Sequence, residues 1–385
     1  MNWKILILLS LGHLIVDLNT GGLPAFLPFL KEALDLSYTM TAAIILTFNV
    51  TSSVIQPIFG FLSDRHSMKW LLPLGCLVAP LGLGLIGFCP SFSWLLFVVA
   101  ISGLGQACYH PESFKTANLV SGGKKASAIS VFHFGGNLGF AISPILATLF
   151  FRWMGLKGSA FFILPGLAMT AVFLATSDWK MPGEPRGVKA SSPQGRQGLR
   201  SQIFPMVLLF LVVILRSATR LGLITFVPFY ILKVLNQDPL VAGKFLSIFL
   251  LMGTIGIVTG GPLADRYGYK LTTILGLALA PATLYLFSIT AGLAALIFFG
   301  AAGFLLISSN SVTMAMGQSF LPQNIAMASA LVLGFSLGIG GIATTIFGWV
   351  ADHWGVSFTL HLIFLLPLLA VAILFFIPDP SRKES

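Results

Sequence analysis

Charged residues are scarce in this chain. Of its 385 residues only 9% are Asp, Glu, Lys or Arg, whereas 56% are hydrophobic. Because about a quarter of the residues of a soluble globular protein are charged, a compact water-soluble body of this length is excluded. The mean hydropathy of +0.93 indicates that a lipid bilayer surrounds most of the chain.

Cysteine is also rare, and the signatures of several enzyme classes are missing. The three cysteines, Cys76, Cys89 and Cys108, form neither an even disulfide set nor a metal-ligand spacing. No Walker loop of the form G-x-x-x-x-G-K-[ST] occurs, so ATP is not expected as the energy source. Neither a serine elbow nor a zinc signature is found. We therefore expect no enzyme, no catalytic residue, no resident metal and no cofactor.

Long apolar runs are what the sequence has instead. Each is close to the roughly 20 residues that a helix needs to cross a bilayer, and none alternates like a strand of a membrane barrel. A backbone in lipid must satisfy its own hydrogen bonds, so we predict α-helices. The first run contains Asp17, is too long for a signal peptide and precedes no cleavage site, so we expect it to be retained. The runs cover residues 5–30, 41–60, 71–89, 92–114, 127–150, 159–176, 204–231, 241–262, 271–290, 292–317, 325–349 and 356–377.

The basic residues predict an orientation. The chain has a net charge of +10. If both termini are cytoplasmic and the helices alternate in direction, most Lys and Arg residues between the runs fall on the cytoplasmic side, as the positive-inside rule requires. The charge thus reports topology and not a nucleic-acid partner. We expect a multi-pass protein of the cell (inner) membrane.

The chain divides into two related halves. Residues 177–203 are polar, basic and rich in Pro, Gly and Ser, which predicts a cytoplasmic linker between one bundle at 1–176 and a second at 204–385. The halves echo each other at an offset of 200 residues, since LPAFLPFL at 23–30 corresponds to LITFVPFY at 223–230. Internal duplication of this kind is typical of transporters whose substrate site lies between the repeats.

Two loops carry the same motif. GFLSDRHSMK occupies residues 60–69 and GPLADRYGYK occupies residues 261–270. Both resemble the loop signature G-x-L-x-D-R-x-G-R-K of the major facilitator superfamily, although Ser67 and Met68 depart from it. The resemblance covers the whole chain and implies an all-α integral membrane fold, with twelve transmembrane helices in two pseudo-symmetric six-helix bundles. It also implies that these loops gate the cytoplasmic side, through Gly60, Asp64, Arg65, Lys69, Gly261, Asp265, Arg266, Gly268 and Lys270.

Three further segments narrow the resemblance. They are HLIVDLNTGGLPAFLPFL at 13–30, GLGQACYHPE at 103–112 and FHFGGNLGFAISP at 132–144. Together they are similar to the fosmidomycin-resistance branch of the superfamily. That resemblance implies proton-driven drug export, with the proton gradient as the energy source. Gly135 and Gly136 in the third segment could serve close helix packing or proton coupling.

Ionisable residues within the apolar runs need a reason, because each costs about 2.5–3.5 kcal/mol on insertion scales. Asp17 lies deep in the first run, one turn after His13 on the same face. Arg216 and Arg220 share a face of the seventh run at a similar depth. We predict that Asp17 takes up a proton and contacts substrate, and that the arginines bind an anionic substrate group through their planar forks. A structural Asp–Arg bridge is the alternative.

The fourth run ends in a second group of candidates. His110 and Glu112 flank a proline there, whereas the equivalent position to His110 in the second half is Asn310. Because the chemistry occurs in one half only, we predict that His110 and Glu112 handle protons. A cytoplasmic gate formed by Glu112 with Lys115 is the alternative. His133 in the fifth run is predicted to contact substrate beside this cluster, with helix packing as its alternative.

These residues predict a proton-coupled antiporter that exports a small drug or anionic metabolite by alternating access. Its partners are the small-molecule substrate and the lipid bilayer, and we expect a monomer. Two alternatives use the same scaffold. One is an importer of a nutrient or siderophore. The other is a divalent-metal carrier in which the histidines and carboxylates named above converge as ligands, although the nearby arginines would repel a cation.

Overall fold

The computed structural model describes residues 1–65, 68–120, 125–176, 199–320, 332 and 336–379. Every regular element in this part of the chain is helical. The first half contains α1 (Trp3–Ala33), α2 (Tyr38–Asn49), η1 (Val50–Val54), α3 (Gln56–Arg65), α4 (Leu71–Leu85), η2 (Ile86–Phe88), α5 (Phe92–Leu119), α6 (Lys125–Met154), η3 (Gly155–Phe162) and α7 (Ile163–Ala175). The second half contains α8 (Leu199–Phe229), η4 (Tyr230–Val234), α9 (Pro239–Tyr267), α10 (Tyr269–Ile289), α11 (Gly292–Phe320) and α13 (Ser336–Leu374).

Local sequence explains where several helices begin. Ser37 caps α2, because its side chain accepts a hydrogen bond from the Met40 N–H at 3.1 Å. Asp238 caps α9 by accepting from the Leu240 N–H at 2.8 Å. Pro239 follows it at the first helical position, where its missing N–H costs nothing.

Ten stretches of the described helices are long and apolar enough to cross a bilayer. Two of them, Val131–Ala175 with 45 residues and Gly338–Leu374 with 37, are about twice the length that one crossing needs. Each folds back at a glycine with positive φ, Gly155 at +60° and Gly355 at +81°. Glycine adopts this backbone without steric cost. Counted as two crossings each, these stretches bring the total to the twelve that the sequence predicts.

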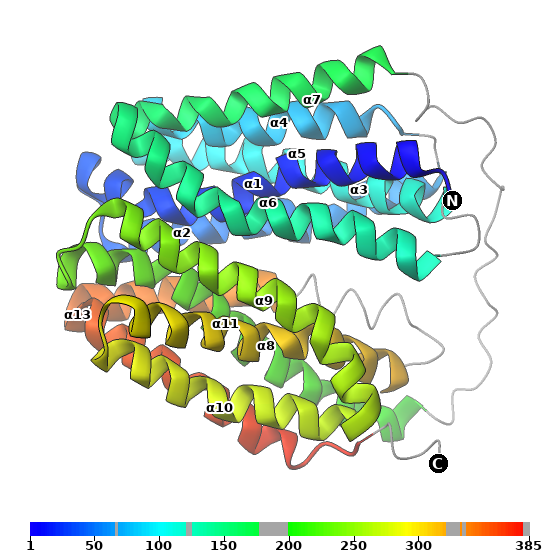
Figure 1. The fold of residues 1–385 in the computed structure, drawn as a ribbon, viewed down its shortest axis with the longest axis vertical. Helices are drawn as coiled ribbons and strands as arrows, with labels where there is room; N and C mark the ends of the chain where they lie inside the picture. The colour runs from blue at the N-terminus through cyan, green and yellow to red at the C-terminus, as the bar shows by residue number, and fades with distance from the viewer. Residues whose placement is uncertain (66–67, 121–124, 177–198, 321–331, 333–335, 380–385) are drawn as a thin grey trace.

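The two halves form two bundles that lie side by side (Figure 1). α1 begins and α13 ends at the same end of the molecule, here called the terminal end; the opposite end is the distal end. Across the boundary α6 packs against α9, and α2 packs against α13. Phe26 and its offset equivalent Phe226 are both fully buried, so the repeat in sequence is also a repeat in packing.

The predicted linker at 177–203 lies largely outside the described residues. α8 already begins at Leu199, so the helix extends into the segment that composition assigns to the linker. The first N–H groups of a helix have no partner within the helix and need water or polar side chains, so a helix can begin in a polar segment. Hydropathy marks the start of the apolar run and not the start of the helix.

Hydrogen bonds and an ion pair join the two bundles at the distal end. The carboxylate of Asp352 in α13 accepts from the backbone N–H groups of Tyr38 and Thr39, at 2.6 and 2.9 Å. It also accepts from the Thr39 hydroxyl at 2.6 Å. Lys233 forms an ion pair with Glu32 nearby. Because these partners come from different halves of the chain, the distal end is held closed in this structure.

Candidate functional site

Asp17 occupies the middle of α1, where its carboxylate meets three side chains. Oδ2 lies 3.2 Å from Nε2 of His13, and Oδ1 lies 3.2 Å from Nε2 of His110 in α5. The Gln106 amide donates to Oδ1 at 2.9 Å. We call His13, Asp17, Gln106 and His110 the Asp17 cluster. The sequence analysis predicts proton handling by Asp17 and His110 and places His13 beside Asp17. It missed Gln106, which lies one helical turn before His110.

Helix α6 packs tightly against the Asp17 cluster. The backbone carbonyl of Phe132 lies 2.9 Å from Nδ1 of His13, and the Phe132 ring stacks on the His13 ring at 4.2 Å between centroids. A Cβ added to Gly136 would lie 2.7 Å from Oδ2 of Asp17 and would also overlap the His13 ring. Glycine at this position therefore allows α6 to approach, which supports the packing role among those open for the glycine-rich segment.

Glu112 lies away from the Asp17 cluster, although only two positions separate it from His110. Two residues span more than half a turn of helix, so the side chains face different neighbours. Glu112 is fully buried and accepts a hydrogen bond from the Ser63 hydroxyl of α3. Lys115 donates to the Ser63 carbonyl at 2.6 Å. This geometry favours the gate that the sequence leaves open as an alternative for Glu112.

His133 lies at the edge of the Asp17 cluster. Its side chain is exposed, and its ring centroid lies 6.1 Å from that of His13. Its nearer ring contact is Phe114, at 5.0 Å. His133 is thus an exposed residue beside the cluster, and its contact with substrate stays a prediction.

The two arginines of α8 have different surroundings. Arg216 is buried, and its Nη1 donates to the Ser309 carbonyl at 3.0 Å and to the Thr313 hydroxyl at 2.6 Å. It thereby joins α8 to α11. Arg220 instead lies over the ring of Phe140 in α6, with 5.1 Å from its guanidinium carbon to the ring centroid. Within the described residues, Nε of Arg220 is buried without a hydrogen-bond partner.

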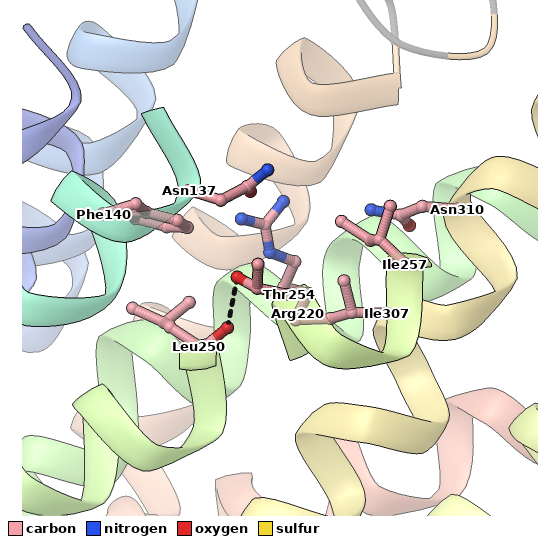
Figure 2. Close-up of a pocket in the computed structure, with 8 residues that line it drawn as sticks. All are labelled: Asn137, Phe140, Arg220, Leu250, Thr254, Ile257, Ile307 and Asn310. Carbon is pink, nitrogen blue, oxygen red and sulfur yellow. Dashed lines mark hydrogen bonds between the residues drawn. The ribbon is translucent and has the colours of Figure 1, made fainter. Parts of the chain in front are cut away.

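Arg220 points into a cavity between the bundles (Figure 2). The cavity measures about 70 Å³, and side chains of α6, α8, α9 and α11 line it. Asn137 lies beside the guanidinium, and Asn310 lines the cavity from the other bundle. The eight residues that line it are Asn137, Phe140, Arg220, Leu250, Thr254, Ile257, Ile307 and Asn310. Sequence reasoning named neither asparagine as a site residue. Two signals could have identified them: Asn137 belongs to the Gly-Gly-Asn segment, and Asn310 lies at the offset of 200 residues from His110.

Opposite charges lie on the two sides of this boundary. The negative charge of Asp17 attracts the positive charge of Arg220, and Arg216 and Arg220 repel each other. Among the described residues, His13, Asp17 and His110 form a set that could hold a metal ion, with ligand atoms within 4.8 Å of one another. The two arginines disfavour a dication there, because Arg216 is buried and Arg220 partly buried, where charges are poorly screened.

The loop motifs end helices at the terminal end. In the first copy, the side chains of Asp64 and Arg65 lie outside the described part of the structure. A Cβ on Gly60 would meet only Pro111, at an ordinary 3.8 Å. The carbonyl of Lys69 accepts from the Leu72 N–H at 3.0 Å in the first turn of α4.

In the second copy, Gly268 ends α9 with φ +96°. Asp265 and Arg266 are exposed, and Lys270 donates to the Phe375 carbonyl at 2.9 Å. The gating role of these residues stays a prediction, because the terminal end shows no bond between them and the other bundle within the described chain.

Sequence reasoning missed a related pattern at the distal end. Gly348, Asp352 and Gly355 have the same spacing as Gly261, Asp265 and Gly268. Gly355 also resembles Gly268 in its backbone, with φ +81° against +96°. A Cβ on Gly348 would lie 2.6 Å from the Tyr38 carbonyl, so glycine allows α13 to approach α2. The matching spacing was the signal that could have identified Asp352.

Two helical bundles that enclose opposite charges within the apolar thickness define a membrane transporter. The comparison with known families agrees: the chain matches the model of the Major Facilitator Superfamily over residues 9–332. The chain belongs to this family. It is 30% identical to the fosmidomycin resistance protein of Escherichia coli (strain K12), with 98% of this chain and 93% of the relative covered. It is also 30% identical to the uncharacterized MFS-type transporter YfnC of Bacillus subtilis (strain 168), with 99% and 95% covered.

Solved structures share the fold at low sequence identity. A bacterial homologue of the human lysosomal transporter Spinster, inward-facing and unoccupied, is 15% identical with a TM-score of 0.80, covering 99% of this chain and 97% of that chain. The nucleoside transporter NupG is 14% identical with a TM-score of 0.76, covering 98% of each chain. At such identities the likeness concerns the fold alone.

Proposed function

We propose that this chain is a proton-coupled antiporter that exports a small anionic molecule, such as a phosphonate drug, across the cell (inner) membrane. Both termini are cytoplasmic in this proposal, the protein acts as a monomer, and it needs no cofactor besides the proton gradient. The observation that carries it is the pairing of a partly buried carboxylate–histidine cluster in one bundle with an incompletely bonded arginine in the other. The name of the Escherichia coli relative supports export of a drug.

Arg220 is the proposed anion-binding residue. Its guanidinium faces the cavity, and a planar fork can bind a phosphonate or carboxylate through two parallel hydrogen bonds. Asn137 and Asn310 can donate further hydrogen bonds from the two bundles. Arg216 is already bonded to α11, so we assign it the role of holding α8 in place and keeping the cavity electropositive.

A measurement of proton exchange tests this proposal. Fosmidomycin is added to purified protein in weakly buffered detergent solution, and proton release is followed with a pH indicator alongside binding by calorimetry. Antiport predicts that wild type releases protons on binding, and that Asp17→Asn binds without release. Binding without any proton exchange in wild type would contradict proton coupling. Glu112→Gln is the matched control, because it removes a carboxylate that lies away from the Asp17 cluster. We expect this variant still to release protons.

A second candidate is symport of a proton with an anion, as in a nutrient importer, and the attraction between Asp17 and Arg220 favours it. An anion on Arg220 would bring negative charge to the boundary, which favours the protonated form of the Asp17 cluster, so proton and anion would bind more tightly together. By linkage each ligand then increases the affinity of the other. Proton uptake instead of release in the same experiment would establish this candidate and exclude antiport for that substrate.

A further inference from the structure

We infer that His13 holds the mobile proton of the Asp17 cluster, as an imidazolium ion, and that Asp17 is its counter-ion. The inference deepens the proposed function and rests on it only for the statement that this proton is transported. Where the proton resides follows from the hydrogen-bond geometry of α1, α5 and α6.

The tautomer of His13 is fixed by the backbone of α6. Nδ1 lies 2.9 Å from the Phe132 carbonyl oxygen. A carbonyl oxygen only accepts hydrogen bonds, so Nδ1 must carry a hydrogen. A neutral imidazole has a single N–H, which would leave a lone pair on Nε2. Nε2 therefore cannot donate to a neighbour unless the ring takes up a second proton.

The neighbour of Nε2 is itself an acceptor. Oδ2 of Asp17 lies 3.2 Å from it, and an ionised carboxylate has no hydrogen to donate. Two lone pairs that face each other at hydrogen-bond distance repel. The contact is thus favourable only when a proton lies between His13 and Asp17, either on the imidazole or on the carboxyl group.

The surroundings of Asp17 place that proton on His13. The Gln106 amide donates to Oδ1 at 2.9 Å, and His110 faces the same oxygen at 3.2 Å. Hydrogen bonds that donate to a carboxylate favour its ionised form. Asp17 therefore stays a carboxylate, and the proton resides on the imidazole.

The other histidines do not share this constraint. Nothing in the described part of the chain fixes the tautomer of His110, so a neutral His110 can donate from Nε2 to Asp17 without a second proton. His133 contacts the Phe114 ring and lies farther away. Besides each other, His13 and Asp17 have four titratable or charged groups around them. These are Tyr109 and His110 from α5, His133 from α6 and Arg220 from α8.

Loss of the proton would act on helix packing. His13 is bonded to α6 through Phe132, and Asp17 is confined by Gly136 of the same helix. When the proton leaves, the ring cannot donate both to Phe132 and to Asp17, and relieving the unfavourable contact requires rotating a side chain or shifting α1 against α6. Deprotonation is thus linked to movement within the first bundle, at the surface that faces the substrate cavity.

Nitrogen NMR of histidine tests the inference without relying on transport. The protein is labelled with ¹⁵N-histidine and studied in nanodiscs at about pH 8, which is well above the ordinary histidine pKa of about 6.5. The chain has six histidines. We expect one of them to show the imidazolium pattern, with both ring nitrogens protonated. That signal should disappear in His13→Gln and persist in the surface control His361→Gln.

Asp17→Asn provides a second test, which remains valid even if His13→Gln does not fold. An amide can donate to Nε2, so His13 should change to the neutral form with hydrogen on Nδ1. A wild-type spectrum in which His13 is neutral would overturn the inference. If His13 is an imidazolium but fosmidomycin binding exchanges no proton, the proposed function fails while the assignment of this proton stands.

Discussion

The two bundles repeat the same helical plan, yet they bring opposite charges to their common boundary. At the offset of 200 residues, Asp17 corresponds to Ser217 and Arg220 corresponds to Thr20. Thr20 accepts a hydrogen bond from Gln106 at 2.7 Å, inside its own bundle, whereas Arg220 points into the cavity between bundles (Figure 2). The duplication supplies the scaffold, and the divergence of a few positions supplies the chemistry. A motion of one bundle against the other therefore changes the distance between unlike charges.

Asp17→Asn should have the largest effect, because it removes the negative charge that the first bundle brings to the boundary. We expect transport driven by a pH gradient to fall by about two orders of magnitude, the range over which a positioned proton-transfer group acts. Exchange of labelled for unlabelled substrate without a gradient should survive. Both are measured in proteoliposomes. Asp238→Asn is the matched control, since asparagine also caps a helix. Full gradient-driven transport by Asp17→Asn would refute the assignment.

Replacing the arginines one at a time should separate their roles. Arg220→Gln is expected to weaken fosmidomycin binding by about 1.5–3 kcal/mol, the value of a hydrogen bond to a charged group. That corresponds to a dissociation constant roughly 10–100 times higher. Arg216→Gln should mainly lower the melting temperature, because it leaves Ser309 and Thr313 with fewer partners. Calorimetry and thermal unfolding distinguish the two. Equal losses of affinity would mean that both arginines contact the anion.

Glycine substitutions should show that the first bundle is packed around its charged cluster. Gly136→Ala would place a Cβ 2.7 Å from Oδ2 of Asp17, and such overpacking costs about 1–3 kcal/mol. Gly261→Ala is the control, because nothing lies within 4 Å of an added Cβ there. Its stability should be unchanged or slightly higher, as expected for alanine in a helix. Thermal unfolding in detergent measures both. A harmless Gly136→Ala would show that α6 can move away freely.

Asp352→Asn should have the smallest effect. Asparagine has one acceptor oxygen in place of the two that bond Tyr38 and Thr39, so the charge at the start of α2 and the contacts of one oxygen are lost. A charge at a helix N-terminus contributes about 0.3–1 kcal/mol. The fraction of molecules closed at the distal end should fall accordingly, as measured by distances between spin labels on α2 and α13. The shift should shrink at high salt. An unchanged fraction at low salt would show that Asp352 does not stabilise the closed end.

The fold was readable from the sequence because a bilayer imposes a length and an apolar composition on each crossing. The sequence also located Asp17, His13 and the arginines, since buried charges in apolar runs are rare enough to mark a site. It could not separate Glu112 from His110, because the neighbours of each depend on which helices pack against α5. The different bonding of Arg216 and Arg220 was hidden for the same reason.

The Gly348–Asp352–Gly355 segment has a kinetic consequence. One spacing of glycine and aspartate ends a helix at each end of the second bundle, at Asp265 and at Asp352. If each aspartate holds its own end closed, the resting orientation depends on the difference between two small free energies, whereas the turnover time depends on each of them separately. Asp265→Asn together with Asp352→Asn should therefore leave the orientation nearly unchanged and make the molecule switch faster.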